Sequence, residues 1–454
     1  MKFESFSELL KVQADTFKDN TAFLYEREGK KQEMTYLELK EAVFRKVEEF
    51  EENSCHAVGI LLPQGPEWII NVFAASIAGK RVVLLDPSIE KKRLQCLIRV
   101  TGIDYIEAPE NLKEGLLLWD IEKTKDDCSG DILFFTSGTT SRNKAVVLTD
   151  KALCYSAWNG QQVLPCFPGD KILAAIPLSH VYGFVCTVLW PLSFGATVVF
   201  GRGLRKLTED PKYFGVTVMS LVPSILKYLI ATDSLNEELR CILIGASPCD
   251  EKTFNLIKEK GIEIRCGYGL TETASGLAMT PVSGNNPYAM EYCPDTEARI
   301  AEDGEVLIKT PSMMKGYYHD PESTKKVLFN GELKTGDIGK IDSNGMLHIL
   351  GRKNEVLVMP NGEKIYCLEM ESELTELLGC ETAVTLDTTG KIGIFVSSED
   401  KTEDEIWKVI SSYNSRQPLG RRILKIYIVR DEFPKTATGK LQRWKLHGLF
   451  HGEN

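Results

Sequence analysis

The stretch Phe134-Phe135-Thr136-Ser137-Gly138-Thr139-Thr140-Ser141-Arg142-Asn143-Lys144 follows a short apolar run that reads as a strand. Small hydroxyl residues and glycine let backbone N–H groups and hydroxyls surround phosphate oxygens, and a lysine supplies a positive charge. No G-x-x-x-x-G-K-[ST] pattern can be aligned, so the stretch is not a Walker A loop. Because hydroxyl-rich turns also occur without a ligand, a phosphate loop and an ordinary turn both remain open on these residues alone.

The composition around this stretch is that of a large globular protein. The chain has 454 residues, 54 basic and 64 acidic side chains, a formal charge of −10 and 43% hydrophobic residues. These values exclude a disordered, fibrous or small disulfide-rich protein. The acidic balance argues against a partner that is a nucleic acid or an anionic membrane. Since one core usually divides beyond about 300 residues, we expect at least two domains.

The twelve cysteines and the N-terminus indicate the compartment. The two cysteines nearest in sequence, Cys241 and Cys249, are eight residues apart. No C-x-x-C pair for zinc or redox chemistry therefore exists, and we expect mostly buried thiols in a reducing compartment. The N-terminal stretch is amphipathic and lacks the apolar region of a secretory signal, so a cytoplasmic location is predicted.

One uncharged segment, between His180 and Arg202, has the length of a membrane span. It contains Gly183 and Pro191, and the run from Ala196 to Phe200 is β-branched and aromatic. We therefore expect a buried helix followed by a buried strand, and no membrane span.

Strands and helices alternate along the first 350 residues. Thr35 and Glu38 form a capping box before a helical pattern over 36–51. Strands are predicted over 57–62, 81–85, 171–176, 198–200, 216–221 and 241–244, and further helices over 66–78 and 89–100. This alternation predicts an α/β fold, with a large N-terminal domain of mixed, mostly parallel sheets covered by helices.

The pattern changes at the polar string from Gly351 to Glu355. Beyond it we expect a small α+β domain, with helices near 367–378 and from Thr402, and strands near 381–386, 391–396 and 423–429. The predicted domains are 1–353 and 354–454. From Arg416 to Lys445 there are nine basic residues against two acidic ones, which fits either a solvated face or a polyanion site.

The stretch from Thr136 to Lys144 resembles the phosphate loop of adenylate-forming (AMP-binding) enzymes, which include acyl-CoA synthetases, nonribosomal peptide synthetase adenylation domains and luciferases. The resemblance extends over nearly the whole chain, beginning with Leu61 to Trp68 and Leu84 to Ser88. Four further signatures follow in the family's order: Gly267-Tyr268-Gly269-Leu270-Thr271-Glu272-Thr273, Lys334-Thr335-Gly336-Asp337, Gly351-Arg352-Lys353-Asn354 and Pro434-Lys435-Thr436-Ala437-Thr438-Gly439-Lys440.

This resemblance implies an AMP-forming acid–thiol ligase. Such an enzyme uses ATP and Mg²⁺ to convert a carboxylate into an acyl-adenylate with release of pyrophosphate, and then transfers the acyl group to a thiol. It implies that Thr271 contacts the α-phosphate and that Glu272 holds the metal, which prefers oxygen ligands. The residues implied to hold the β- and γ-phosphates are Thr136, Ser137, Gly138, Thr139, Thr140 and Lys144.

The resemblance also assigns the nucleoside. Asp337 and Arg352 are implied to bind the ribose hydroxyls, and a carboxylate is a natural acceptor for a diol. Tyr268, between Gly267 and Gly269, is implied to pack on adenine, with Gly245-Ala246-Ser247 on the other side. The sequence around Ser247 misses the G-x-S-x-G elbow by one residue, which removes a hydrolase interpretation.

Lys440 is implied to enter the site during adenylation, where it stabilises charge at the carboxylate and α-phosphate. The small domain of the family then rotates about a hinge that Asn354 matches, whereas most relatives carry Asp or Lys there. Ser141, Asn143 and Ala145 replace the usual Gly, Pro and Gly of the phosphate loop, and their Cβ atoms restrict the backbone. A nucleotide-binding pseudoenzyme is therefore an alternative from a different class.

The sequence limits the identity of the carboxylic acid and of the thiol acceptor less than it limits the nucleotide. His180 and Tyr182 are the residues expected at the acyl pocket, near the place where amino-acid-activating relatives carry an Asp. We therefore expect a fatty or aryl acid without an α-amino group. The chain length also fits o-succinylbenzoate-type ligases. Phe184, Trp190 and Phe194 line the pocket or belong to the core. Free coenzyme A is the expected acceptor and an acyl or peptidyl carrier protein the alternative.

Overall fold

The structure is a computed structural model that describes residues 2–113, 128–136, 144–282, 284–358, 364–386, 391–435, 441–443 and 445–446. The chain divides into two compact units. Unit 1 comprises Met1–Glu297 and Lys309–Leu333, and unit 2 comprises Ala298–Ile308 and Lys334–Asn454. Unit 2 therefore begins before the polar string at Gly351, and a mobile domain that starts at Asn354 stays a prediction.

A nine-stranded sheet forms one layer of unit 1, in the order β14-β13-β12-β11-β10-β8-β9-β1-β2. Its middle strands, from β12 to β1, pair in parallel, and both edges are antiparallel. The strands are β1 (Thr21–Arg27), β2 (Lys30–Thr35), β8 (Lys171–Leu173), β9 (Thr197–Val199), β10 (Val218–Leu221), β11 (Cys241–Ile244), β12 (Glu263–Leu270), β13 (Ser275–Met279) and β14 (Glu291–Tyr292).

A six-stranded sheet forms the second layer of unit 1, in the order β17-β7-β6-β4-β3-β5. β6, β4, β3 and β5 are parallel, whereas β7 and β17 are antiparallel to their neighbours. Its strands are β3 (Ala57–Ile60), β4 (Arg81–Leu84), β5 (Tyr105–Glu107), β6 (Ile132–Phe135), β7 (Ala145–Leu148) and β17 (Gly316–Tyr317). The predicted mixed, mostly parallel sheets are confirmed.

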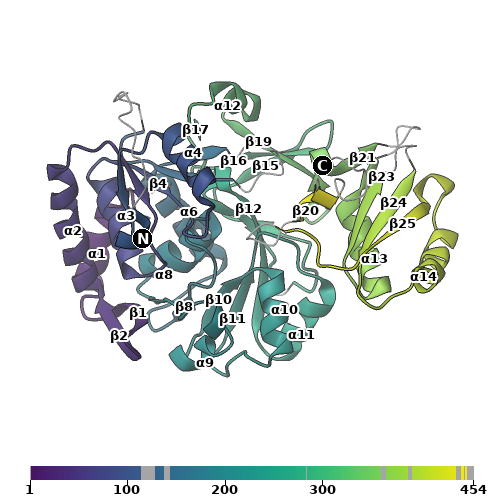
Figure 1. The fold of residues 1–454 in the computed structure, drawn as a ribbon, viewed down its shortest axis with the longest axis horizontal. Helices are drawn as coiled ribbons and strands as arrows, with labels where there is room; N and C mark the ends of the chain where they lie inside the picture. The colour runs from purple at the N-terminus through teal and green to yellow at the C-terminus, as the bar shows by residue number, and fades with distance from the viewer. Residues whose placement is uncertain are drawn as a thin grey trace. The chain divides into compact units, whose positions relative to one another are not determined.

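Helices cover these sheets, and α1, α2 and α3 lie side by side (Figure 1). α3 packs against β3 and β4, α6 against β13, and α11 against β12. The capping box of Thr35 and Glu38 is present at the start of α2. The helices are α1 (Phe6–Thr16), α2 (Tyr36–Glu52), α3 (Pro66–Ile77), α4 (Lys91–Thr101), α5 (Glu110–Lys113), α6 (Asp150–Val163), α7 (Val181–Phe184), α8 (Trp190–Ser193), α9 (Asp210–Phe214), α10 (Pro223–Ala231), α11 (Glu251–Glu259) and α12 (Pro321–Val327).

The uncharged segment after His180 forms a buried helix followed by a strand, as predicted. α7 continues through a π-helical turn over Val185–Leu189 into α8, and β9 follows. No helix in the described parts of the chain is long and apolar enough to cross a membrane. All twelve cysteines are free, and most are buried, as expected.

Phe184 anchors this segment in the core of unit 1. Its fully buried ring lies 5.7 to 6.3 Å from the rings of Phe6, Trp68, Phe73 and Phe134. Aromatic pairs at such distances contribute about 0.5–1.5 kcal/mol each beyond the area that they bury. Phe184 therefore belongs to the core and not to a substrate pocket.

Unit 2 contains an antiparallel sheet and a smaller α+β part. β16 pairs with β15 and β19, and β19 also pairs with β20, whereas its first two residues belong to unit 1 and pair with the short β18 (Leu328–Phe329) of that unit. The elements of unit 2 are β15 (Glu297–Ile300), β16 (Glu305–Lys309), β19 (Glu332–Ile341), β20 (Leu347–Arg352), β21 (Val356–Val358), β22 (Lys364–Tyr366), α13 (Cys367–Leu378), β23 (Thr382–Leu386), β24 (Ile392–Ser397), α14 (Glu403–Ser415) and β25 (Ile423–Val429).

The elements predicted beyond residue 366 are confirmed. α13 packs against β23, α14 packs against β25, and α14 begins at the predicted capping box of Thr402 and Glu405. β24 pairs antiparallel with β23 and parallel with β25. Buried side chains of both helices and all three strands form a core of their own.

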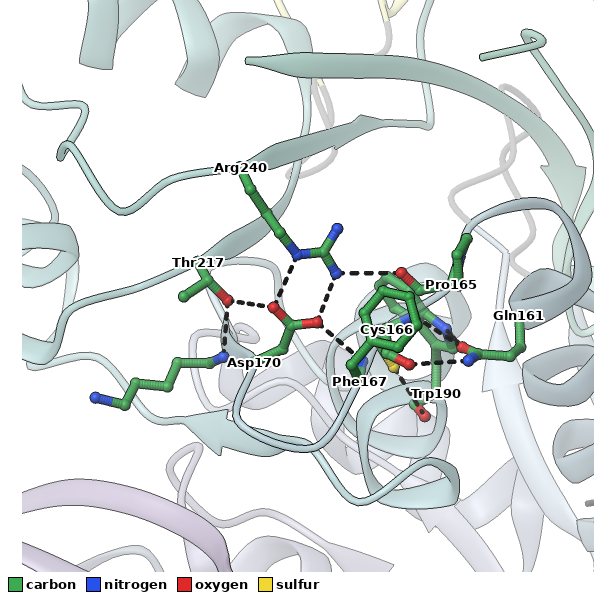
Figure 2. A network of polar contacts seen from close by, with 9 residues as sticks. Gln161, Pro165, Cys166, Phe167, Asp170, Trp190, Thr217 and Arg240 are labelled. Atoms are coloured by element: carbon green, nitrogen blue, oxygen red, sulfur yellow. Dashed lines mark hydrogen bonds and ion pairs between the residues drawn. The ribbon is translucent and has the colours of Figure 1, made fainter. Parts of the chain in front are cut away.

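A polar network fixes the amino ends of β8, β10 and β11 (Figure 2). The buried Asp170 carboxylate accepts hydrogen bonds from Arg240 at 2.5 and 2.8 Å, from the Thr217 hydroxyl at 2.8 Å and from the Phe167 N–H at 2.9 Å. The Thr217 hydroxyl in turn accepts from the Lys171 N–H. One carboxylate thus joins three neighbouring strands at the edge opposite their carboxyl ends.

Asp170 gives a test of this network through its pKa. Burial alone would raise that pKa, but the hydrogen bonds from Arg240, Thr217 and Phe167 hold it below 3.8. A lowered folded-state pKa stabilises the fold above the unfolded pKa of about 3.9, and this stability is lost as the pH falls through the folded value. We expect Asp170→Asn to lower the free energy of unfolding by about 2 kcal/mol at pH 7.

Urea denaturation between pH 7 and pH 3 measures this effect. The difference between parent and variant should stay constant down to about pH 5 and shrink below about pH 4. Glu49→Gln is the matched control because Glu49 pairs with Lys46 on the exposed face of α2, and it should change the stability by less than about 0.5 kcal/mol. A difference that is independent of pH would contradict the role of Asp170.

Candidate functional site

The hairpin of β6 and β7 closes the base of the predicted phosphate loop. Phe135 pairs with Ala145, and the Thr136 N–H donates to the Lys144 carbonyl at 3.0 Å. Ala145 is the first residue of β7, where a Cβ is accommodated, so this departure from the usual glycine does not strain the backbone. Four predicted phosphate contacts lie outside the described residues: Ser137, Gly138, Thr139 and Thr140.

The predicted metal carboxylate follows β12 directly. Thr271, Glu272 and Thr273 form a single 3-10 turn, and one Glu272 carboxylate oxygen accepts from the Tyr317 hydroxyl at 2.8 Å. The Lys144 ammonium lies 4.3 Å from the centre of the Tyr317 ring. The structure therefore brings Lys144 and Glu272 to one tyrosine, although 128 residues separate them in sequence.

Gly267, Tyr268 and Gly269 lie on β12, between β11 and β13. The register shifts between Tyr268 and Gly269, where a Cβ on Gly269 would lie 1.7 Å from the Ser275 carbonyl oxygen. Only glycine fits this approach of the two strands. The glycine of the signature is thus explained by the pairing of β12 with β13.

Gly245, Ala246 and Ser247 follow β11, and Tyr182 lies directly against Gly245. A Cβ on Gly245 would lie 2.7 Å from the Tyr182 ring. The Tyr182 hydroxyl donates to the carbonyl oxygens of Leu243 and Leu221, 2.9 and 3.2 Å away. Burial raises the pKa of this hydroxyl well above 10, which keeps it a donor.

His180 stands immediately before α7, and its backbone N–H donates to the Pro177 carbonyl. The roles of His180 and Tyr182 in binding the acid stay predictions. The contacts of Tyr182 show that its hydroxyl is engaged with the backbone and that its ring supports the loop after β11.

The predicted ribose residues meet in unit 2. Asp337 on β19 pairs in register with Arg352 on β20, and a carboxylate oxygen of Asp337 lies 3.0 Å from the Arg352 Nε. Asp337 is buried and Arg352 is about one-third exposed. Their predicted contact with ribose remains a prediction, but the two side chains do form one group.

Glu305 supports this group from the neighbouring strand β16. Its carboxylate accepts from the Gly336 N–H at 2.9 Å and from the Lys353 ammonium at 2.7 Å. Asp303 also binds Lys353, and this contact holds the pKa of Asp303 below its ordinary value. Asn354 follows in the short 3-10 turn Lys353–Glu355, and its hinge role stays a prediction.

A family model described as "AMP-binding enzyme" matches residues 10–128 and 107–318. The chain belongs to the AMP-binding enzyme family. A 2-succinylbenzoate–CoA ligase of Listeria monocytogenes serovar 1/2a is 30% identical over 363 residues, which covers 76% of this chain and 75% of that protein.

Solved structures of relatives share the fold. The O-succinylbenzoate coenzyme A synthetase (MenE) of Bacillus subtilis in complex with AMP has a TM-score of 0.82 at 25% identity and covers 96% of this chain and 97% of its own. The same enzyme in complex with ATP and a magnesium ion has a TM-score of 0.82 at 24% identity, covering 97% of this chain and 99% of its own.

These findings confirm the predicted superfamily and the predicted enzyme class, an AMP-forming acid–thiol ligase. The family model also agrees with the expectation of a nucleotide. The assignment of individual site residues stays a prediction.

Glu272 fits a magnesium ion that arrives with a nucleotide. A carboxylate has about four lone-pair positions, and one hydrogen bond from Tyr317 leaves the others available for a cation. Within the described ranges, no cluster of three or more His, Cys, Asp or Glu side chains forms a complete metal site. Magnesium is usually held by one or two carboxylates together with substrate phosphates, which matches this single carboxylate.

Lys440 lies outside the described residues, but both flanks of its segment are described. Lys435 and Leu441 form a β-bridge, and the Gln442 N–H donates to the Pro434 carbonyl at 2.8 Å. Arg443 then makes a bidentate ion pair with the buried Glu371 of α13, at 2.5 and 2.6 Å. Unit 2 thus holds both ends of the segment that carries the predicted lysine.

Sequence reasoning missed Tyr317 and Glu305. Tyr317 is 45 residues from Glu272, and Glu305 is 31 residues from Gly336. Neither residue belongs to a quoted signature, and no local spacing relates them to one. The sequence Gly316-Tyr317-Tyr318, a glycine before two aromatic residues, was the one local feature that could have drawn attention to Tyr317.

The contact between Tyr182 and Gly245 predicts the effect of Gly245→Ala. The added Cβ meets a ring that two carbonyl contacts hold in place, so the loop after β11 must move. Overpacking of this kind costs about 1–3 kcal/mol. We expect AMP affinity, measured by calorimetry, to fall at least about fivefold.

Gly160→Ala is the control, because a Cβ there meets nothing within 4 Å and the residue lies inside α6. It should leave AMP affinity unchanged and slightly stabilise the helix. Unchanged AMP affinity in Gly245→Ala would show that this loop does not contribute to nucleotide binding.

Proposed function

We propose that this protein is a 2-succinylbenzoate–CoA ligase. The observation that carries the proposal is the 30% identity with a ligase of that name over 76% of the chain. ATP, Mg²⁺ and coenzyme A are its co-substrates and cofactor. The proposal narrows the expected class of fatty or aryl acids to one aromatic dicarboxylate.

In the first step, a carboxylate oxygen of the acid attacks the α-phosphorus of ATP. The bond from that phosphorus to the bridging oxygen breaks, and pyrophosphate leaves with both electrons of the bond. In the second step, the thiol sulfur of coenzyme A attacks the acyl carbon and displaces AMP, while the thiol proton passes to solvent. In the first step, negative charge passes from the carboxylate to the leaving pyrophosphate, and in the second it passes through the acyl oxygen to the phosphate of the leaving AMP, so both steps depend on fixed positive groups.

Residues of unit 1 suit the first step. Lys144 supplies a positive charge at the base of the phosphate loop, and Glu272 supplies the oxygen ligand that magnesium needs. Magnesium bound there neutralises phosphate charge. In unit 2, the paired Asp337 and Arg352 accept and donate hydrogen bonds at the ribose hydroxyls.

Pyrophosphate release across a panel of acids tests the substrate. The panel contains 2-succinylbenzoate, benzoate, octanoate and phenylalanine, each with ATP and Mg²⁺ and with or without coenzyme A. We expect release with 2-succinylbenzoate at least about 100-fold above the others in kcat/KM, because a site built for the keto group and second carboxylate of this acid would reject analogues that lack them. Coenzyme A should stimulate release and yield a thioester.

Each other result changes the proposal. Preference for octanoate or benzoate would make the named substrate wrong. Adenylation without thioester formation would favour a carrier protein as acceptor. If no acid causes pyrophosphate release although the protein binds ATP, the result would favour the pseudoenzyme.

Lys440 gives a separate test of the two-step mechanism. We expect Lys440→Ala to lower adenylate formation at least about 100-fold, because it removes a charge that stabilises the transition state. Thioester formation from supplied acyl-adenylate should fall less than about tenfold. Rapid-quench assays of the two half-reactions measure both values.

Lys408→Ala is the control for the loss of a lysine in unit 2, because Lys408 is exposed on α14. Its two half-reactions should match those of the parent. An equal loss in both half-reactions of Lys440→Ala would contradict the assigned role.

A further inference from the structure

Tyr317 lies between two charged residues that the ligase reaction requires. Its hydroxyl donates to a carboxylate oxygen of Glu272 at 2.8 Å, and its ring carries the Lys144 ammonium 4.3 Å from the ring centre. Tyr317 itself is 8% exposed, so its position is set by packing. One buried side chain therefore contacts both the predicted metal carboxylate and the predicted phosphate lysine.

The backbone around Tyr317 is fixed to the same two elements. The Met314 N–H donates to the Glu272 carbonyl at 2.8 Å, and the Tyr318 N–H donates to the Ala145 carbonyl at 2.8 Å. β17 pairs antiparallel with β7, which places Tyr317 opposite Val146. The segment from Met314 to Tyr318 therefore spans from the turn after β12 to the base of the phosphate loop.

The start of α12 holds Tyr317 from the other side. The Thr324 hydroxyl accepts from the Tyr317 N–H at 2.9 Å and donates to the Asp320 carbonyl at 2.9 Å. A Cβ on Gly316 would lie 2.9 Å from Thr324, so the glycine before Tyr317 permits this close packing. The tyrosine thus has a fixed backbone as well as a buried ring.

We propose that Tyr317 is a positioning residue that orients Glu272 toward the magnesium of Mg-ATP and holds Lys144 toward the phosphates. The inference rests on the proposed ATP-dependent function. Hydrogen bonds to a metal-binding carboxylate fix its orientation, and their loss typically weakens metal binding 10- to 100-fold. The ring adds an attraction that holds the Lys144 ammonium without a counter-charge.

Two substitutions separate the two contacts. Tyr317→Phe removes the hydroxyl that Glu272 accepts from and keeps the ring beneath Lys144. Tyr317→Leu removes both. Tyr318→Phe is the matched control, because it deletes a hydroxyl from the adjacent tyrosine, whose ring contacts Arg81 and His319.

The readout is ATP affinity by calorimetry, measured with saturating magnesium and with EDTA, without any acid. In Tyr317→Phe, the gain in ATP affinity from magnesium should fall about tenfold, while AMP affinity stays within about twofold of the parent. In Tyr317→Leu, ATP affinity in EDTA should also fall about threefold, because the support for Lys144 is lost. Tyr318→Phe should match the parent in every condition.

A double-variant cycle distinguishes positioning from a general structural role. Glu272→Gln removes the charged ligand, so adding Tyr317→Phe to it should cause no further loss of the magnesium gain. If the two losses instead add, or if Tyr317→Phe retains the full magnesium gain, the proposal is wrong. An equal fall in AMP affinity would also overturn it, since AMP does not need the metal.

This outcome is independent of the acid. If 2-succinylbenzoate gives no pyrophosphate while magnesium still strengthens ATP binding through Tyr317, only the substrate assignment fails. If 2-succinylbenzoate is activated but the magnesium gain of Tyr317→Phe is normal, only the role of Tyr317 fails.

Discussion

The hydroxyl of Tyr182 joins the carboxyl ends of two neighbouring strands of unit 1, β10 and β11. β10 and β11 are parallel, so their carboxyl ends lie at one edge of the sheet, where ligands of such sheets bind. There the Leu221 carbonyl accepts from the Gly245 N–H at 3.1 Å, and the Tyr182 hydroxyl contacts the carbonyl oxygens of both Leu221 and Leu243. Its ring then leaves room for nothing larger than glycine at 245.

The position of Tyr182 depends in turn on the core. Phe184, two residues later on α7, is surrounded by rings from α1, α3 and β6. A ring enclosed by several others has one favourable position, because protein interiors are close-packed. The packing between the two sheets of unit 1 therefore sets the helix that carries Tyr182 and, through Tyr182, the loop after β11. Apolar contacts between residues distant in sequence therefore fix the position of the loop after β11.

Helices and strands that depend on neighbouring residues could be predicted from the sequence alone. The capping boxes at Thr35 and Thr402, and the alternation of apolar strands with amphipathic helices, predicted elements that the structure has within a few residues. The signatures at Glu272 and Asp337 identified the family. The strand ends were less well predicted. The strand predicted over 171–176 ends at Leu173 in the structure. The prediction was too long because the apolar residues that follow Leu173 lie in a buried loop.

Contacts between distant segments could not be predicted. Glu272 and Tyr317 are neighbours only because β17 returns to pair with β7, and a single sequence contains no pattern for that pairing. The same holds for Asp170 and Arg240, which are 70 residues apart. The departures at Ser141 and Asn143 lie outside the described residues, whereas Ala145 is an ordinary strand residue, so the concern about its Cβ does not apply.

One of the three signatures in unit 2 shows how neighbouring residues support a single carboxylate. In Lys334-Thr335-Gly336-Asp337, the Thr335 hydroxyl accepts from the Asp337 N–H and donates to the Val306 carbonyl, while its own carbonyl accepts from Arg352. Gly336 adopts a φ of 70°, which favours glycine, and its N–H donates to Glu305. These contacts hold the backbone beside Asp337, whose carboxylate pairs with the Arg352 guanidinium. A motif that a sequence presents as four equivalent letters therefore contains, in the structure, one paired carboxylate and two residues, Thr335 and Gly336, that hold the backbone beside it.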